Sequence, residues 1–406
     1  MEEKTKFLWI TQKESPFTPG RPVPIEYFIA RIKEIERLER AIKQASSGRN
    51  ENIFIMGERG IGKSSLAGFI RYVAQKDYQF IGAHCSLGSA RNLDEVCRLI
   101  FQKLLQELPD KNLFEKVKDI FGKYIKNIDL LGMNIEFTTS KDELDNLRLN
   151  FLPTLRSLFS KIQNEKKGIT VVLDDLNGIA DISDFSFFLK SIVDEIATSG
   201  KKLPLLLILV GIPERREKMI KHQPSVARIF DIIDLAPMNK EETEDFFRKM
   251  FGRQNISIEP EAISSMVDLS GGFPTLMHEV GDAIFWEDKD NKIDEEDARY
   301  GIIDAAENVG RKYLAPQVYK AIGSETYRSI LRKIGDLPLG TNFQRREILK
   351  KMSEEEQKTF DNFLQRIKRL GIINETEIRG EYRFVNQLYH LYVMLEAFKF
   401  RERQRS

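Results

Sequence analysis

A glycine-rich stretch directly after an apolar run constrains the fold of this 406-residue chain more than any other feature. Ile53–Met56 predicts a buried strand, residues 57–65 read Gly-Glu-Arg-Gly-Ile-Gly-Lys-Ser-Ser, and residues 65–72 predict a helix. Glycine tolerates positive φ angles, so successive backbone N–H groups of such a stretch can all point inward at an anion. Strand, GxxxxGK[ST] and helix, in this order, are the pattern of a phosphate-binding loop, whereas a chance glycine-rich turn requires neither flanking element.

The residue types in this loop fit a nucleoside triphosphate and its magnesium ion. We expect Lys63 to place positive charge on the β- and γ-phosphates and the Ser64 hydroxyl to bind Mg²⁺. The N-terminus of the following helix adds partial positive charge. The expected ligands are therefore ATP and Mg²⁺, and the expected binding residues of the loop are Gly57, Glu58, Arg59, Gly60, Ile61, Gly62, Lys63, Ser64 and Ser65.

Two carboxylates at the end of a later apolar run, 169–173, complete the predicted site. Asp174 would hold the metal, and Asp175 would orient or deprotonate the attacking water. By itself, a pair of aspartates also occurs where a strand turns into a loop. We expect adjacent strands to bring Ser64 and Asp174 together.

The order of the remaining elements predicts an α/β fold. Amphipathic spacing predicts a helix over 32–46, and alternation around Gly132 predicts a hairpin over 127–138. Strands alternating with helices indicate a mostly parallel sheet, so the expected fold is a three-layer P-loop NTPase sandwich. Its strands are expected at 53–56, 79–85, 169–173, 205–210 and 230–235.

The second half of the chain predicts helices. After Pro237 we expect no further strands until the C-terminal part, a capping box at Asn239 and Glu242, and a helical lid that contains a helix over 259–269. Helices over 325–334, 343–352 and 354–370, followed by a hairpin that turns at Arg379-Gly380, predict a winged helix. The expected divisions are an extended leader 1–25, an ATPase core 26–237, the lid 238–322, the winged helix 323–398 and a basic tail 399–406.

Charge and cysteine usage restrict the classes of partner. The net charge of +1 gives no global attraction to nucleic acid or membrane, but residues 324–406 hold 17 Lys and Arg against 12 Asp and Glu. Two cysteines without CxxC spacing and single scattered histidines argue against a disulfide framework or a zinc site. The first residues lack a signal-peptide pattern and no apolar run is long enough for a bilayer, so we expect a cytoplasmic protein without membrane contact.

On these motifs the chain resembles the AAA+/STAND group of P-loop ATPases, especially archaeal and bacterial ATPases with a C-terminal winged helix, and more distantly origin-recognition initiators. Residues 28–31, Phe-Ile-Ala-Arg, resemble the family's FVGR box near the adenine, which implies Phe28 and Arg31 as nucleotide contacts. Ala30 replaces the usual glycine there. Pro274, at the end of Gly-Gly-Phe-Pro, resembles the GxP proline that packs on the base, although a glycine C-cap followed by proline is also ordinary helix punctuation.

The resemblance also implies an arginine that reaches a neighbouring subunit. Arg228 lies in the matching segment and is our finger or sensor candidate; Arg215 and Arg216 compete for the role, and a surface arginine at a helix end is the plain alternative. Departures from the AAA+ motors are Asp175 in place of glutamate, no polar sensor in 205–211 and no lid arginine. These departures favour a switch that hydrolyses ATP slowly.

Two functions from different classes remain open for the winged helix. In the first, ATP controls binding of duplex DNA by residues 324–406, as in initiators or transposition regulators. Its third helix and wing carry the expected contacts, Lys358, Asn362, Gln365, Arg366, Lys368, Arg369 and Arg379, against which Glu354, Glu355 and Glu356 would present the wrong sign to phosphates. In the second, the winged helix contacts a protein partner or inhibits the core, as in STAND switches. If Arg228 acts on the nucleotide of another subunit, the protein forms a homo-oligomer. A kinase is disfavoured because the sequence shows no pattern of a pocket for a phosphate acceptor.

Overall fold

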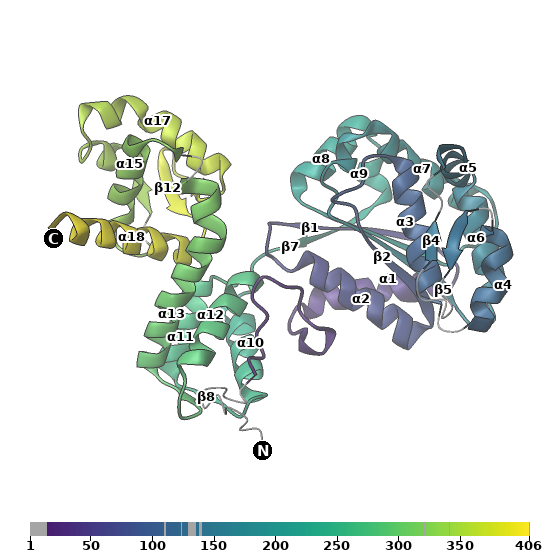
Figure 1. Ribbon diagram of the computed structural model, residues 1–406, viewed down its shortest axis with the longest axis horizontal. Helices are drawn as coiled ribbons and strands as arrows, with labels where there is room; N and C mark the ends of the chain where they lie inside the picture. Colours follow the sequence, from purple (N-terminus) through teal and green to yellow (C-terminus); the bar gives the residue numbers. More distant parts are fainter. Residues whose placement is uncertain are drawn as a thin grey trace, which may run out of the picture. The chain divides into compact units, whose positions relative to one another are not determined.

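The computed structural model describes residues 14–108, 111–122, 124–128, 135–137, 140–319, 322–340 and 342–405. The chain separates into two compact units, and Figure 1 shows both. One unit is Pro22–Ala236; the other joins the described residues before Pro22 to those from Pro237 onward. The finer limits expected for the leader, lid and winged helix stay predictions.

The unit Pro22–Ala236 is built on a five-stranded parallel sheet with the order β2-β5-β6-β1-β7. All five expected strands are present within two residues of their predicted bounds. They are β1 (Glu51–Gly57), β2 (Phe80–Ser86), β5 (Gly168–Asp174), β6 (Leu205–Gly211) and β7 (Asp231–Leu235). The expectation that β1 and β5 are adjacent was wrong, because β6 lies between them. Every residue of β6 is buried, as expected for a strand covered on both faces in the middle of a sheet.

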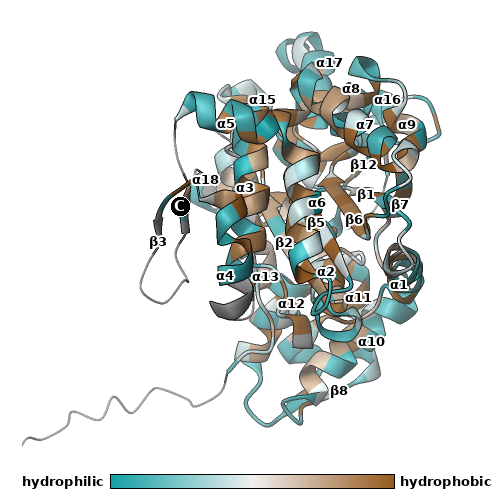
Figure 2. Ribbon diagram, turned by 90° about the vertical axis from the view of Figure 1, so that its right-hand side faces the viewer, coloured by the Kyte–Doolittle hydropathy of each residue, from teal (hydrophilic) through white to brown (hydrophobic). Residues whose placement is uncertain are grey.

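Helices cover both faces of this sheet, which makes the predicted three-layer sandwich. Figure 1 shows α1 (Ile32–Ser46) and α2 (Lys63–Tyr78) on one side and α3 (Leu93–Gln106) and α7 (Ser183–Thr198) on the other. In Figure 2 the strands are coloured mostly as hydrophobic, whereas the helices also carry hydrophilic residues. The remaining helices of this unit are η1 (Ile25–Tyr27), α4 (Lys111–Phe121), α5 (Lys141–Leu149), α6 (Phe151–Ile162), η2 (Ile179–Asp181), α8 (Pro213–His222) and α9 (Val226–Ile229).

The predicted hairpin is present as the antiparallel pair β3 (Ile125–Ile128) and β4 (Ile135–Phe137). Its turn, including Gly132, lies outside the described residues. The pair stands between β2 and β5 in the chain, so it is an insertion into the alternating pattern of strands and helices.

The second unit begins with a set of helices. They are α10 (Lys240–Gly252), α11 (Pro260–Ser270), α12 (Pro274–Glu287) and α13 (Glu295–Val309), followed by the π-helix η3 (Gly310–Tyr319). The capping box at Asn239 and Glu242 is confirmed, with both reciprocal hydrogen bonds present. The expectation of no strands here was wrong by one short parallel pair, β8 (Ser257–Ile258) and β9 (Lys292–Ile293). The leader residue Phe17 packs against Phe251 of α10, with 4.9 Å between ring centroids.

The same unit ends in a winged helix with its own apolar core. Its elements are α15 (Glu325–Gly335), β10 (Phe343–Gln344), α16 (Arg345–Leu349), α17 (Glu354–Arg369), β11 (Ile373–Glu375), β12 (Glu381–Phe384) and α18 (Gln387–Arg405). The helix expected over 343–352 starts later, because Phe343 is buried and pairs with Tyr382 in a sheet of the order β10-β12-β11. Residues 399–405, expected as a tail, instead continue α18, where Lys399 pairs with Glu307 at 2.7 Å.

Helices in the described ranges all fall short of the length and apolarity needed to cross a membrane.

Candidate nucleotide-binding site

The loop between β1 and α2 has the backbone conformation that its glycines predict. Gly57, Gly60 and Gly62 have φ angles of 148°, 79° and 91°, which side-chain-bearing residues rarely adopt. At Gly57 a Cβ atom would also stand 2.7 Å from the Leu235 carbonyl oxygen of the neighbouring strand β7. A larger residue at Gly57 is therefore disfavoured both by the φ angle and by the contact with β7, because the loop begins close to that strand.

Lys63, the first residue of α2, folds its ammonium group back over this loop. Its Nζ donates to the Gly57 carbonyl at 2.9 Å and to the Glu58 carbonyl at 2.6 Å. Burial lowers the pKa of Lys63, while the Asp174 carboxylate acts to raise it. A cation held over backbone N–H groups at a helix N-terminus is a donor set that fits phosphate oxygens.

Asp174 ends β5 at the same edge of the sheet and is buried. Its Oδ2 accepts from His84 Nε2 at 3.0 Å, and its Oδ1 accepts from the Asp175 N–H at 2.8 Å. Burial acts to raise the pKa of Asp174, but hydrogen bonds from His84 and Ser64 outweigh it and lower that pKa. The carboxylate is thus held ionised beside the Ser64 hydroxyl, although β6 separates β5 from β1.

These oxygens fit a magnesium ion. A serine hydroxyl and a carboxylate are hard oxygen ligands, and Mg²⁺ in nucleotide sites takes few protein ligands and completes its shell with phosphates and water. The described residues contain no cluster of three or more histidine, cysteine or acidic side chains that could hold a metal ion.

His84 is a site residue that the sequence analysis missed. It lies on β2, in parallel register with Val172 of β5, and its side chain is about a quarter exposed. A signal existed in retrospect: His84 is the one basic residue in the strand Phe80–Ser86, most of whose other side chains are apolar. Linking it to Asp174 required knowledge that β2 and β5 are neighbours.

Asp175, the predicted water-orienting residue, is exposed directly beyond the strand. Its φ of 56° lies in the left-handed region, where a non-glycine residue is strained and which aspartate tolerates better than most. The Asn177 side chain donates to its Oδ1. The structure therefore places Asp174 and Asp175 in different surroundings, one buried and one facing solvent.

The Phe28–Arg31 box lies against the loop helix. The Phe28 ring stacks on Phe69 of α2 with centroids 4.6 Å apart, and Ala30 and Arg31 both have positive φ angles of 72° and 65°. Arg31 is only 5% exposed, and its guanidinium donates to the Ile61 carbonyl at 3.2 Å. The Arg31 side chain thus contacts the backbone of the phosphate-binding loop, a role that the motif alone did not predict.

The three arginine candidates differ in their partners. Arg228, in α9, is exposed, and among the described residues its side chain has one long contact, 3.5 Å, with the Ser225 hydroxyl. Arg215, in α8, bonds to the Asn177 side chain at 3.0 Å and to Asp181 at 3.3 Å, and Arg216 lies half-buried beside it. Pro274 begins α12 in the other unit, so its predicted contact with the base stays a prediction.

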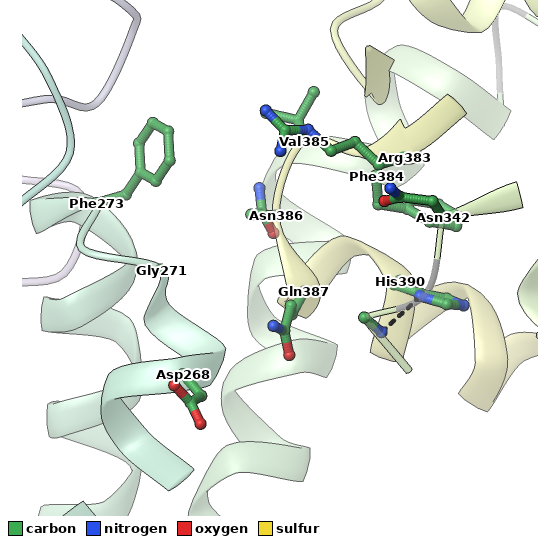
Figure 3. A pocket seen from close by; sticks show the side chains of 11 residues that line it. Asp268, Gly271, Phe273, Asn342, Arg383, Phe384, Val385, Asn386, Gln387 and His390 are labelled. Atoms are coloured by element: carbon green, nitrogen blue, oxygen red, sulfur yellow. Dashed lines mark hydrogen bonds between the residues drawn. The ribbon is translucent and has the colours of Figure 1, made fainter. Parts of the chain in front are cut away.

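A separate hollow lies within the second unit, between the C-terminal end of α11 and the winged helix. It has a volume of about 310 Å³ and is lined mainly by polar side chains and backbone. Figure 3 shows Asp268, Gly271 and Phe273 on one side and Asn386 and Gln387 at the start of α18 on the other. None of the residues predicted for nucleotide or metal binding lines this hollow.

Comparison with known proteins agrees with the geometry of the loop and sheet. The family model described as the AAA ATPase domain matches residues 27–208, which run from the Phe28 box through β6. This part of the chain is therefore similar to the AAA ATPase domain. The matched residues include the phosphate-binding loop, both aspartates and His84, whereas Arg215 and Arg228 lie beyond them.

Solved structures share the fold of the whole chain. A Walker-type ATPase of Pyrococcus abyssi is 17% identical, with 91% of this chain and 96% of that chain covered and a TM-score of 0.55. The ORC2 protein of Aeropyrum pernix, solved in ADPNP–ADP complexes, is 13% identical, with 92% and 96% covered and a TM-score of 0.57. At these identities the likeness shows the fold alone, a parallel sheet covered by helices and followed by helical C-terminal parts.

One curated relative is also similar in sequence. It is an uncharacterised HTH-type transcriptional regulator of Methanocaldococcus jannaschii, 23% identical over 279 residues. The match covers 64% of this chain, and this chain spans 64% of the length of that relative.

Proposed function

We propose that this protein is a Mg²⁺-dependent ATPase that hydrolyses ATP slowly and acts as a nucleotide-dependent switch for DNA binding by its winged helix. In this proposal residues 26–237 are the ATPase core, 238–322 the lid and 323–398 the winged helix. The observation that carries the first half is the loop, with three positive-φ glycines and Lys63 over its rim, next to the buried Asp174.

Each residue of the site has a role in the proposed reaction. Backbone N–H groups of residues 57–65 bind the phosphates, and Lys63 exchanges its two carbonyl partners for phosphate oxygens. Ser64 and Asp174 would hold Mg²⁺, which neutralises charge on the β- and γ-phosphates when bound. Asp175, exposed at the strand end, orients the attacking water, and Arg31 braces the loop through the Ile61 carbonyl.

Substitution of Lys63 tests the nucleotide half. In Lys63→Ala the affinity for a fluorescent ATP analogue should fall at least about 100-fold, because the ammonium group held over the loop is lost. Lys76→Ala is the matched control, since Lys76 is exposed near the end of the same helix α2. Equal affinities for wild type and Lys63→Ala would refute ATP binding at this loop.

The second half of the proposal rests on the exposed face of α17. Lys358, Asn362, Gln365 and Arg369 recur at intervals of four, three and four residues, so they share one face of the helix, and all are exposed. Amide and basic side chains of this kind contact base edges and phosphates. The curated relative of the HTH regulator class lends support to this function.

The glutamates at the start of α17 oppose DNA less than their number suggests. Glu356 is 5% exposed and turns inward, where Lys333 Nζ donates to it at 2.5 Å and the Ser353 N–H at 2.8 Å. Of the three glutamates, Glu354 and Glu355 are exposed. Their position in the first turn complements the helix dipole.

Binding of duplex DNA measured against salt concentration tests this half. Affinity should fall steeply with salt, and the double substitution Lys358→Ala, Arg369→Ala should weaken it and reduce the salt slope by about 2. Lys399→Ala is the control, because Lys399 is paired with Glu307. Absence of binding at low salt would reject the DNA switch.

That negative result would favour the second candidate, a STAND-like switch whose winged helix contacts a protein. The observation in its favour is at the wing, where Ile378 is 58% exposed next to Arg379. An exposed aliphatic side chain at a loop tip suits an apolar protein contact.

Arg228 is proposed to act on the nucleotide of a second copy of the chain. Its exposure and the lack of an acidic partner among the described residues support this role. In Arg228→Ala, turnover should fall while ATP affinity stays, and ATP should promote oligomers of wild type. Unchanged turnover would withdraw the assignment.

A further inference from the structure

The surroundings of Asp175 hold a short chain of hydrogen bonds that the proposed ATPase mechanism does not yet use. We infer that Asn177 and Arg215 are positioning residues that orient the Asp175 carboxylate for hydrolysis, and that Arg215 therefore acts within its own chain and not on a phosphate. This inference rests on the proposed ATPase function, because it concerns the residue that is proposed to orient the attacking water.

The Asp175 carboxylate is confined on two sides. Its Oδ1 accepts from Asn177 Nδ2. Its Oδ2 lies over Gly88, which follows β2, so closely that a Cβ atom on Gly88 would be 2.3 Å away. The backbone of Asp175 is itself held in the left-handed region by the bond from its N–H to Asp174 Oδ1. These contacts restrict the Asp175 carboxylate to one orientation in the loop after β5.

Arg215 decides which way the Asn177 amide faces. Arg215 Nε donates to Asn177 Oδ1 at 3.0 Å. Because the amide oxygen accepts this bond, the amide NH₂ group faces the Asp175 carboxylate. Without Arg215 the amide could rotate and present its oxygen to Asp175, which would repel the carboxylate. Asn177 alone therefore does not determine the orientation of Asp175.

Arg215 is in turn fixed by its own partners. Its Nη1 pairs with Asp181 of η2 at 3.3 Å, and Lys218, one turn later on α8, pairs with the same carboxylate. The Arg215 side chain is only 22% exposed. Because α8 directly follows the central strand β6, these bonds tie the Asp175 loop to the middle of the sheet.

The arrangement leaves one carboxylate oxygen of Asp175 for water. Oδ1 is occupied by Asn177, whereas the described residues supply no hydrogen-bond donor to Oδ2. A water that donates to Oδ2 would be oriented by it. As the water oxygen bonds to the γ-phosphorus, the bond from that phosphorus to the β–γ bridging oxygen breaks, ADP leaves and the proton of the water passes to Oδ2. The residues that hold Oδ1 thereby set the direction in which Oδ2 acts.

Single-turnover ATP hydrolysis of the full chain, with ATP affinity measured in parallel, tests this inference. In Asn177→Ala and in Arg215→Ala we expect hydrolysis to slow about 10-fold, a part of the 10²–10⁴-fold that a positioned acid–base group supplies, with ATP affinity unchanged within about 2-fold. The double substitution should slow hydrolysis no more than either single substitution does. When Asn177→Ala or Arg215→Ala is added to Asp175→Asn, hydrolysis should not slow further. Unchanged or faster hydrolysis would overturn the inference, as would a parallel loss of ATP affinity.

Gly88→Ala tests the same geometry by contact alone. The added methyl group would push the Asp175 carboxylate aside without removing a polar group, so hydrolysis should slow while ATP affinity stays. Gly82→Ala is the matched control, because Gly82 lies in β2, shortly before Gly88 in the chain, and its Cβ would displace another flexible side chain, Arg71, at 2.7 Å. Equal rates for the two alanine variants would contradict the role of Gly88.

A measurement without hydrolysis separates this inference from the proposed function. In protein labelled with ¹⁵N-asparagine, the side-chain amide signal of Asn177, assigned by its loss in Asn177→Ala, should shift in both Arg215→Ala and Asp175→Asn. An unmoved signal overturns the inference even if ATP is hydrolysed. A shifted signal in a protein that does not hydrolyse ATP upholds the hydrogen-bond chain and rejects the ATPase function.

Discussion

Glu356 is buried at the start of α17, and its replacement by glutamine should destabilise the winged helix by an amount that depends on pH. Burial acts to raise the pKa of this carboxyl, but hydrogen bonds from Lys333 Nζ, the Ser353 N–H and the Ser329 hydroxyl outweigh it and lower the pKa from 4.5 to about 2. At about 1.4 kcal/mol for each pKa unit, this difference corresponds to about 3 kcal/mol in favour of the folded state at pH 7.

The sign of the pH dependence follows from the lowered pKa. Between pH 4.5 and about 2 the unfolded state binds a proton that the folded state refuses, so the stabilisation is complete above pH 4.5 and is lost as the pH falls through that range. Glutamine keeps the size of the side chain and removes its charge. The difference in unfolding free energy between wild type and Glu356→Gln should therefore shrink from about 3 kcal/mol at pH 7 towards zero near pH 2.

Hydrogen exchange of the α17 amides, read by mass spectrometry at several pH values and corrected for the intrinsic rates, measures the local opening free energy. The matched control is Glu354→Gln, since Glu354 lies in the same first turn and is exposed. Its effect should stay within about 0.5 kcal/mol. If the two variants lose the same protection, or if the loss in Glu356→Gln is as large at pH 3 as at pH 7, the argument from the buried ion pair is wrong.

Three further predictions concern the second unit. Phe17→Ala should destabilise it by about 3–5 kcal/mol because a buried ring is lost, whereas Phe398→Ala, at a residue 56% exposed, should change stability by at most about 0.5 kcal/mol in the same urea titrations. Gly281→Ala should cost about 1–3 kcal/mol, because its Cβ would stand 2.2 Å from the Phe17 ring, and Gly252→Ala, with open space around it, should not; equal midpoints would contradict this. Burial lowers the pKa of His278 to about 4, so stability should fall as pH drops from about 6.5 to 4, and thermal midpoints of His278→Gln should lack this part of the slope.

Features determined by near neighbours in the chain were predicted well. The helix expected over 32–46 is observed at Ile32–Ser46, and the strand expected over 205–210 at Leu205–Gly211. Periodic burial and the exclusion of water decide such elements within about ten residues. The loop 57–65 is of the same kind, because its conformation requires glycine at the positive-φ positions wherever the loop lies in the fold.

Elements that exist only through distant partners were missed or misplaced. Phe343 reads as the start of a helix, yet it forms β10 because β12, almost 40 residues later, offers backbone hydrogen bonds and the Tyr382 ring. The residues over 399–405 continue α18, where Lys399 pairs with Glu307 of α13 and Arg401 pairs with Asp336, directly after α15. No local pattern contains either fact.

The sequence by itself determined that a phosphate-binding loop exists and that two aspartates stand at the end of a later apolar strand. It also determined that helices and a wing follow. Only the tertiary structure decided that β6 separates the two halves of the site, that His84 supports Asp174 and that Arg215 reaches Asp175 through Asn177. The physical reason is that φ preferences and hydrophobic periodicity act over a few residues, whereas the neighbours of a strand and the partner of a polar side chain depend on how the whole sheet buries its apolar faces.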